Sequence, residues 1–219
     1  MHIDVEKIFM EYTDRLIELS NERPESDIWF VTTVFQDNPN KEQAGLINSD
    51  WYIQNLWRQY EVFYDRLCSK IVRNKRRSDR YQYLPLTFDF LDYGGTRKNS
   101  KKGLQEPNTP HFHSLYLIHP DTAEPFQKLV EQKFEPLVRE EKLARLISVD
   151  AKPVTRTRES FQKTVSYSSK LMESHTGKCI HTTTAMVNQF PKSPTQQPSR
   201  MNPRHAAIER MKQLQQQGT

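Results

Sequence analysis

The hydrophobic pattern of this chain switches between helical and strand spacing along its length. Residues 3–20 and 49–72 carry apolar side chains three and four positions apart, which predicts two amphipathic helices. Residues 28–36 are rich in β-branched and aromatic side chains, which is typical of a strand. The complete set of expected elements is helices at 3–20, 49–72, within 119–141 and at 160–174, and strands at 28–36, 84–92, 111–118 and 143–151.

The order of these elements predicts an α+β fold. From residue 28 onward it reads β-α-β-β-α-β, which is the ferredoxin-like (RRM-like) arrangement of an antiparallel sheet with helices on one face. The helix at 3–20 precedes this core, and the helix at 160–174 follows it. We expect the opposite face of the sheet to be left open for a site.

The composition changes near the C-terminal end and suggests a domain boundary there. Beyond residue 188 the chain is dominated by Pro, Gln and Ser, which cannot build a hydrophobic core. We therefore expect one domain over residues 1–187, with its core at 28–175. Residues 188–219 are expected to be a flexible tail that contains at most a short helix at 206–217.

The segment PHFHSLYLIHP, residues 110–120, carries the first candidate chemistry. His111 and His113 are two positions apart in an expected strand, so both side chains point to one face, about 6–7 Å apart along it. Phe112 between them points into the core. Two imidazoles in this position can hold one metal ion, although a solvated strand end would show the same pattern. His119 lies at the far end of the strand and is expected to be structural.

A metal site needs a further ligand, and the strand at 84–92 offers a carboxylate. Its apolar alternation is expected to face the helices and is carried by Leu84, Leu86, Phe88 and Phe90. Asp89 has the other parity, so it is expected on the open face and is the preferred third ligand. Asp92 ranks second because its parity is wrong, and Glu106, in the loop ahead of the histidines, is a remoter alternative.

These residues carry a resemblance to a known family. A His-hydrophobic-His motif followed downstream by Tyr-x-x-Lys, here Tyr167 and Lys170, resembles the HUH endonucleases. It is most similar to the single-tyrosine replication initiators (Rep proteins) of rolling-circle plasmids and phages. Segment Ile28–Asn38 is similar to the family's motif on its first strand, so the three motifs occur in the family's order over roughly residues 28–175.

The resemblance implies a DNA endonuclease and strand transferase that starts rolling-circle DNA replication. Tyr167 would attack a phosphate of single-stranded DNA and keep the 5′-phosphate as a phosphotyrosine intermediate, while His111, His113 and Asp89 hold a divalent metal, Mg or Mn. Lys170 lies on the same helical face as Tyr167 and could hold the phosphate. The implied partner is single-stranded DNA or an origin hairpin. A separate helicase is expected because the chain has no P-loop motif.

The charge distribution is consistent with a polyanionic partner. The formal net charge is +5, and basic residues gather in Ser69–Arg80 and Thr96–Lys102. Either segment alone would be a solvated loop, but both border the strand at 84–92. The expected DNA-binding residues are Lys75, Arg76, Arg77, Lys101 and Lys102.

Other features limit the location and leave alternatives open. The chain has no run of eighteen apolar residues and no signal-peptide pattern, and Cys68 and Cys179 lack metal-site spacing. We expect no membrane association and a location in the cytoplasm of a prokaryotic host. A non-catalytic nucleic-acid-binding module of the same fold is one alternative, and an HUH transposase or relaxase is another. Relaxases usually place the tyrosine ahead of the histidines, unlike this chain.

Overall fold

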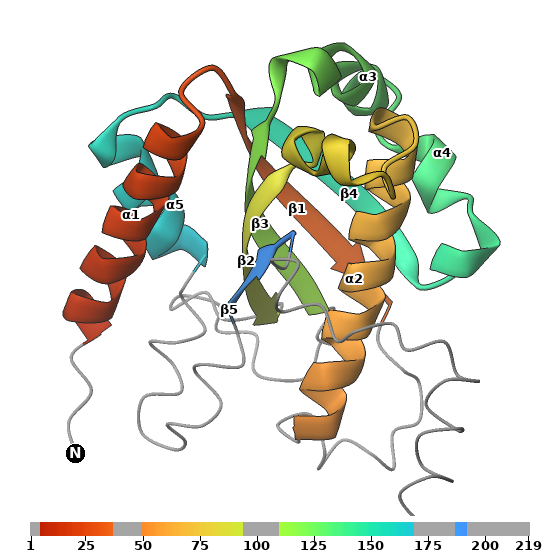
Figure 1. Ribbon diagram of the computed structural model, residues 1–219. Helices are drawn as coiled ribbons and strands as arrows, with labels where there is room; N and C mark the ends of the chain where they lie inside the picture. The colour runs from red at the N-terminus through yellow and green to blue at the C-terminus, as the bar shows by residue number, and fades with distance from the viewer. Residues whose placement is uncertain (1–4, 37–49, 94–109, 169–186, 192–219) are drawn as a thin grey trace, which may run out of the picture.

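A computed structural model describes residues 5–36, 50–93, 110–168 and 187–191 (Figure 1). Strands and helices alternate along most of the chain, as the hydrophobic pattern predicts. The helices are α1 (Val5–Glu22), α2 (Asp50–Ile71), α3 (Pro120–Glu131), α4 (Glu135–Val138) and α5 (Arg158–Ser168), with short 3-10 turns η2 (Ser78–Tyr83) and η3 (Glu141–Leu143). The strands are β1 (Asp27–Phe35), β2 (Leu86–Tyr93), β3 (Pro110–Ile118), β4 (Leu146–Pro153) and β5 (Val187–Phe190).

The strands form one antiparallel sheet in the order β4-β1-β3-β2-β5. The expected α+β class is confirmed, and the first four strands are compatible with a ferredoxin-like order. Strand β5 is not predicted, because its sequence VNQF is short, half polar and followed by a proline-rich stretch. The expected domain boundary after residue 187 therefore falls inside a strand of the sheet. The short helix expected at 206–217 lies outside the described residues.

One face of the sheet is covered by α2 and α3. The buried side chains of α2 recur three or four residues apart, so they form one stripe along the helix, namely Leu56, Tyr60, Phe63, Leu67 and Ile71. They pack with Phe35, Phe112 and Tyr116 of the sheet and Phe126 of α3. Burying each such side chain stabilises the fold by roughly 1.5–3 kcal/mol.

The other face is not open, and that expectation is wrong. Helices α1 and α5 cover most of it and lie on the opposite side of the sheet from α2 and α3 (Figure 1). The contacting side chains are Leu16 and Leu19 of α1, Phe161 and Val165 of α5, and Leu86, Phe88, Phe90, Leu115 and Leu117 of the sheet. The cause is visible in the continuous apolar run Leu115–Ile118 of β3, which indicates burial on both faces of the sheet.

The cover on this second face is incomplete near the end of β1. Phe30, Thr32 and Val34 point to it and are only partly buried. This end of the sheet also carries the beginning of β3 and the end of β2, because Val34 pairs with His111 and Asp92 pairs with His111 from the other side. The candidate chemistry of the chain therefore lies at the margin of the α1–α5 layer.

Candidate metal centre

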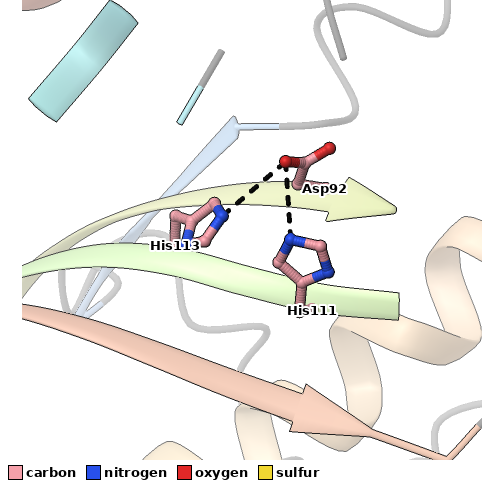
Figure 2. A group of neighbouring side chains, drawn as sticks. All are labelled: Asp92, His111 and His113. Carbon is pink, nitrogen blue, oxygen red and sulfur yellow. Dashed lines mark ion pairs between the residues drawn. The ribbon is translucent and has the colours of Figure 1, made fainter. Parts of the chain in front are cut away.

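Two histidines of β3 and one carboxylate of β2 converge at this end of the sheet. Asp92 lies opposite His111 in the antiparallel register, which brings side chains of neighbouring strands within reach of each other. The Asp92 Oδ2 atom is 3.4 Å from His111 Nε2 and 3.6 Å from His113 Nε2. Figure 2 shows the carboxylate facing both imidazoles, with each ion pair marked by a dashed line.

The two separations between the Asp92 carboxylate and the imidazoles fit ligands of a shared ion. The three ligand atoms lie within 4.8 Å of one another. Distances of 3.4 and 3.6 Å are longer than a typical N–H···O hydrogen bond. Ligands that each lie about 2.0–2.2 Å from one ion are themselves roughly 3–3.5 Å apart. The group could therefore hold a metal ion.

Burial strengthens this fit. Asp92 and His113 are each 4% exposed, so water solvates neither the carboxylate nor that imidazole well. His111 is the more accessible ligand, with 17% of its side chain exposed. A carboxylate held away from water needs a cation to compensate its charge, either protonated imidazole or a metal ion. An opening at His111 leaves one side of the group accessible from solvent.

Residues of β1 fix the orientation of His113. Thr32 Oγ1 is 3.2 Å from His113 Nδ1, and the ring of Phe30 stacks on the imidazole at 5.4 Å. The contact between Thr32 and Nδ1 leaves Nε2 directed toward Asp92. Metal-binding histidines are commonly oriented in this way, by a hydrogen-bonding partner at the ring nitrogen that does not bind the metal. The sequence does not reveal Thr32, because strand parity places it on one face but does not say which strand is its neighbour.

The prediction that Asp89 shares the face of the histidines is wrong. Asp89 is fully buried on the α2 face, where the Tyr60 hydroxyl donates to its Oδ1 and the Thr87 hydroxyl to its Oδ2, each at 2.6 Å. Tyr60 also lies 2.7 Å from Ser114 Oγ and 2.8 Å from the Tyr116 hydroxyl. Asp89 therefore belongs to a buried polar network and not to the histidine group.

The error in the choice of carboxylate came from the register. The apolar residues of β2 do face helices, but those helices are α1 and α5, and the histidines point to the same face. Asp92 has the parity of Phe88 and Phe90, so it joins the histidines. Burial raises the pKa of Asp89 to about 7, and the hydrogen bonds from Thr87 and Tyr60 oppose this rise.

Tyr167 lies next to the histidine group. Its ring centroid is 5.0 Å from that of His113 and 6.0 Å from that of Phe30. Phe161 and Val165 anchor α5 on the sheet, and Tyr167 follows them at the margin with 43% of its surface exposed. The structure thus brings the expected tyrosine and the expected histidines together, although they are far apart in the chain.

The remaining predicted site residues lie elsewhere or outside the described residues. Lys170, Lys101, Lys102 and Glu106 belong to the segments that the structure leaves undescribed. The group Lys75, Arg76 and Arg77 precedes the start of β2, as expected, whereas Asp92 lies near the end of that strand. Leu86 and Asp92 are about 20 Å apart at ~3.3 Å per residue. His119 caps α3, since its Nδ1 accepts from the Asp121 backbone N–H at 3.2 Å.

Comparisons with known proteins add no relative. No protein-family model matches the chain, and no match was found among curated proteins or solved structures. In the part of the chain that the structure describes, no helix is long and apolar enough to cross a membrane.

Proposed function

We propose that this protein is a metal-dependent endonuclease that nicks and rejoins single-stranded DNA through Tyr167 and thereby initiates rolling-circle replication. The observation that carries the proposal is the position of the Tyr167 ring, 5.0 Å from a histidine of a group that could hold a metal ion. The strand order β4-β1-β3-β2 and the two helices on one face also support a ferredoxin-like core.

His111, His113 and Asp92 would hold the metal. Imidazole suits several divalent ions, whereas the carboxylate adds affinity for harder ions, so we infer Mg or Mn. When bound, such an ion polarises a phosphoryl oxygen and makes the phosphorus more electrophilic. Thr32 and Phe30 hold the His113 ring in place for this role.

Tyr167 supplies the nucleophile in the proposed reaction. Its oxygen forms a bond to phosphorus and the P–O3′ bond breaks, so that the 5′-phosphate remains on the tyrosine. The phenolic proton passes to solvent, and the departing 3′ oxygen gains a proton. Because one phosphoester replaces another, the free 3′-hydroxyl can later attack the phosphotyrosine and rejoin the strand. The exposure of Tyr167 leaves room for a DNA strand to approach it.

The partner would be single-stranded DNA or an origin hairpin, opened by a separate helicase.

The test combines metal binding with nicking. Wild type, His111→Ala and His113→Ala are titrated with Mn by calorimetry and incubated with labelled single-stranded oligonucleotides. His119→Ala is the matched control, because His119 follows β3 directly, caps α3 and lies outside the metal group. We expect both group variants to lose Mn binding and nicking while the control retains both. Wild-type Mn affinity in either group variant would contradict the metal assignment.

A further inference from the structure

A hollow of about 320 Å³ lies between α2 and the turn that leads through η3 into β4. Figure 1 shows the chain between α4 and β4 passing close to α2. The Gln36 backbone N–H donates to the Arg145 carbonyl at 2.7 Å, which ties this turn to the end of β1. The volume is at the lower end of the range for small-molecule sites, about 300–1,000 Å³. We call this space the α2–η3 hollow.

Part of the lining of the hollow is apolar. Phe35, Leu143 and Leu146 line it and are each at most 5% exposed, so they are packed into the core beneath α2. Val62 of α2 also lines it, but 39% of its surface is exposed, which is unusual for a large apolar side chain in the described part of the protein. A flat apolar ring bound in the hollow would remove this surface of Val62 from water.

A hydrogen-bond acceptor without a donor lines the same hollow. The Oε1 atom of Gln59 is shielded from solvent and accepts no hydrogen bond from any described residue. A buried acceptor in this state destabilises the protein, and a ligand that offers an N–H group would satisfy it. Among the nucleobases, glutamine matches the edge of adenine, because its oxygen accepts from the 6-amino group while its amide nitrogen donates to N7.

Three cations surround the hollow and leave it positively charged. Arg58 of α2 and Lys142 and Arg145 of the turn line it, against one carboxylate, Glu141. Within the described residues none of these three cations has an ion-pair partner. Arginine binds phosphate through several N–H groups held in one plane. The lining therefore suits a ligand that combines an apolar ring, an N–H donor and an anionic group.

We propose that the α2–η3 hollow binds one adenine nucleotide, either free or as a unit of single-stranded DNA. The 6-amino group of the base donates to Gln59 Oε1, the ring lies against Val62, and Arg58 and Arg145 bind the phosphate. The hollow lies on the α2 face of the sheet, whereas the metal group lies on the opposite face. This is therefore a separate binding site, and the inference does not depend on the proposed nicking reaction.

The experiment measures binding by calorimetry without added metal, so that nicking does not contribute. The free probes are deoxyadenosine monophosphate, its analogue with an unsubstituted purine base, and deoxyadenosine. The analogue lacks only the 6-amino group, and the nucleoside lacks only the phosphate. The strand probes are two short single-stranded oligonucleotides of equal length, one built from deoxyadenylate and one from the analogue. A comparison of these probes on the wild type needs no variant.

Two variants test the residues of the hollow. Gln59→Leu removes the acceptor, and its matched control is Gln127→Leu, an exposed glutamine of α3 that does not line the hollow. Arg58→Gln together with Arg145→Gln removes the phosphate contacts. The control for this pair is Arg139→Gln together with Lys128→Gln, two exposed cations away from the hollow. Thermal melts establish that all variants are folded.

We expect the wild type to bind the adenine probe about two- to tenfold more tightly than the analogue, which is the effect of one hydrogen bond. Gln59→Leu should lose this preference, and Gln127→Leu should keep it. The arginine variant should lose affinity for the monophosphate but not for the nucleoside. A preference seen with the free probes identifies a free nucleotide as a ligand, and one seen only with the strand probes identifies a unit of DNA.

Three results would overturn the inference. One is a wild type that does not prefer adenine to the analogue with either kind of probe. Another is a Gln59→Leu variant that keeps the preference of the wild type. The third is an arginine variant that binds the adenine probes as tightly as its control.

Discussion

Asp89→Asn should change how the stability of the protein depends on pH. Asp89 is fully buried, and burial raises its pKa from 3.8 to about 7. Between these two values the folded protein holds a proton that the unfolded chain has released. The free energy of unfolding of the wild type therefore falls as pH rises from about 4 to 7, and this contribution is constant above pH 7.

The magnitude follows from the shift. About three pKa units at 1.36 kcal/mol each give a total of about 4 kcal/mol, of which about 3 kcal/mol falls between pH 4.5 and 8. Asparagine keeps the shape and the hydrogen-bonding oxygen but cannot ionise. The stability of Asp89→Asn relative to wild type should thus increase by about 3 kcal/mol over this range.

Urea unfolding at several pH values, followed by circular dichroism, measures this difference. The matched control is Asp150→Asn, which removes a carboxylate with 69% of its side chain exposed to water. We expect the control to follow the wild-type pH course. If the curves of Asp89→Asn and wild type are parallel from pH 4.5 to 8, the buried carboxyl is not the titrating group and the reasoning is refuted.

Two further predictions concern the metal group. Asp92→Ala should abolish Mn binding in calorimetry, whereas Asp89→Ala should leave the Mn affinity within a few fold of wild type. The reverse ranking would show that Asp89 is the third metal ligand, as the sequence predicts. Thr32→Val should weaken Mn affinity by roughly 10- to 100-fold, because the orienting contact at His113 is lost. The neighbouring Thr33→Val is the control: its buried hydroxyl has no hydrogen-bond partner among the described residues, so stability should rise by about 1 kcal/mol with Mn affinity unchanged.

Hydrophobic spacing was enough to predict the main elements of the fold, within a few residues at their ends. The stripe of α2 and the alternation of β1 are local patterns, and packing against the sheet preserves them. The short strand β5 could not be predicted, because it depends on pairing with β2 and not on its own composition. The same limit applies to the layers, because the sequence shows that the second half of β3 is apolar on both faces but does not show which helices cover each face.

The candidate site was predictable where it depends on local geometry. The i, i+2 spacing places His111 and His113 on one face without knowledge of the rest of the fold. The carboxylate depends on the register between β2 and β3, which pairs Asp92 with His111 and sends Asp89 to the other face. Thr32 and the remote position of the basic turn depend on strand order and helix direction, which a single sequence does not specify.

The most direct test of the proposed function is covalent capture on Tyr167. Wild-type protein is incubated with a pool of labelled single-stranded oligonucleotides and Mn, then resolved on a denaturing gel and analysed by peptide mass spectrometry. We expect a protease-sensitive protein–DNA band, with the 5′-phosphate on the peptide that contains Tyr167, and no such band from Tyr167→Phe. A band of undiminished intensity from Tyr167→Phe, or an adduct on another tyrosine, would show that Tyr167 is not the nucleophile.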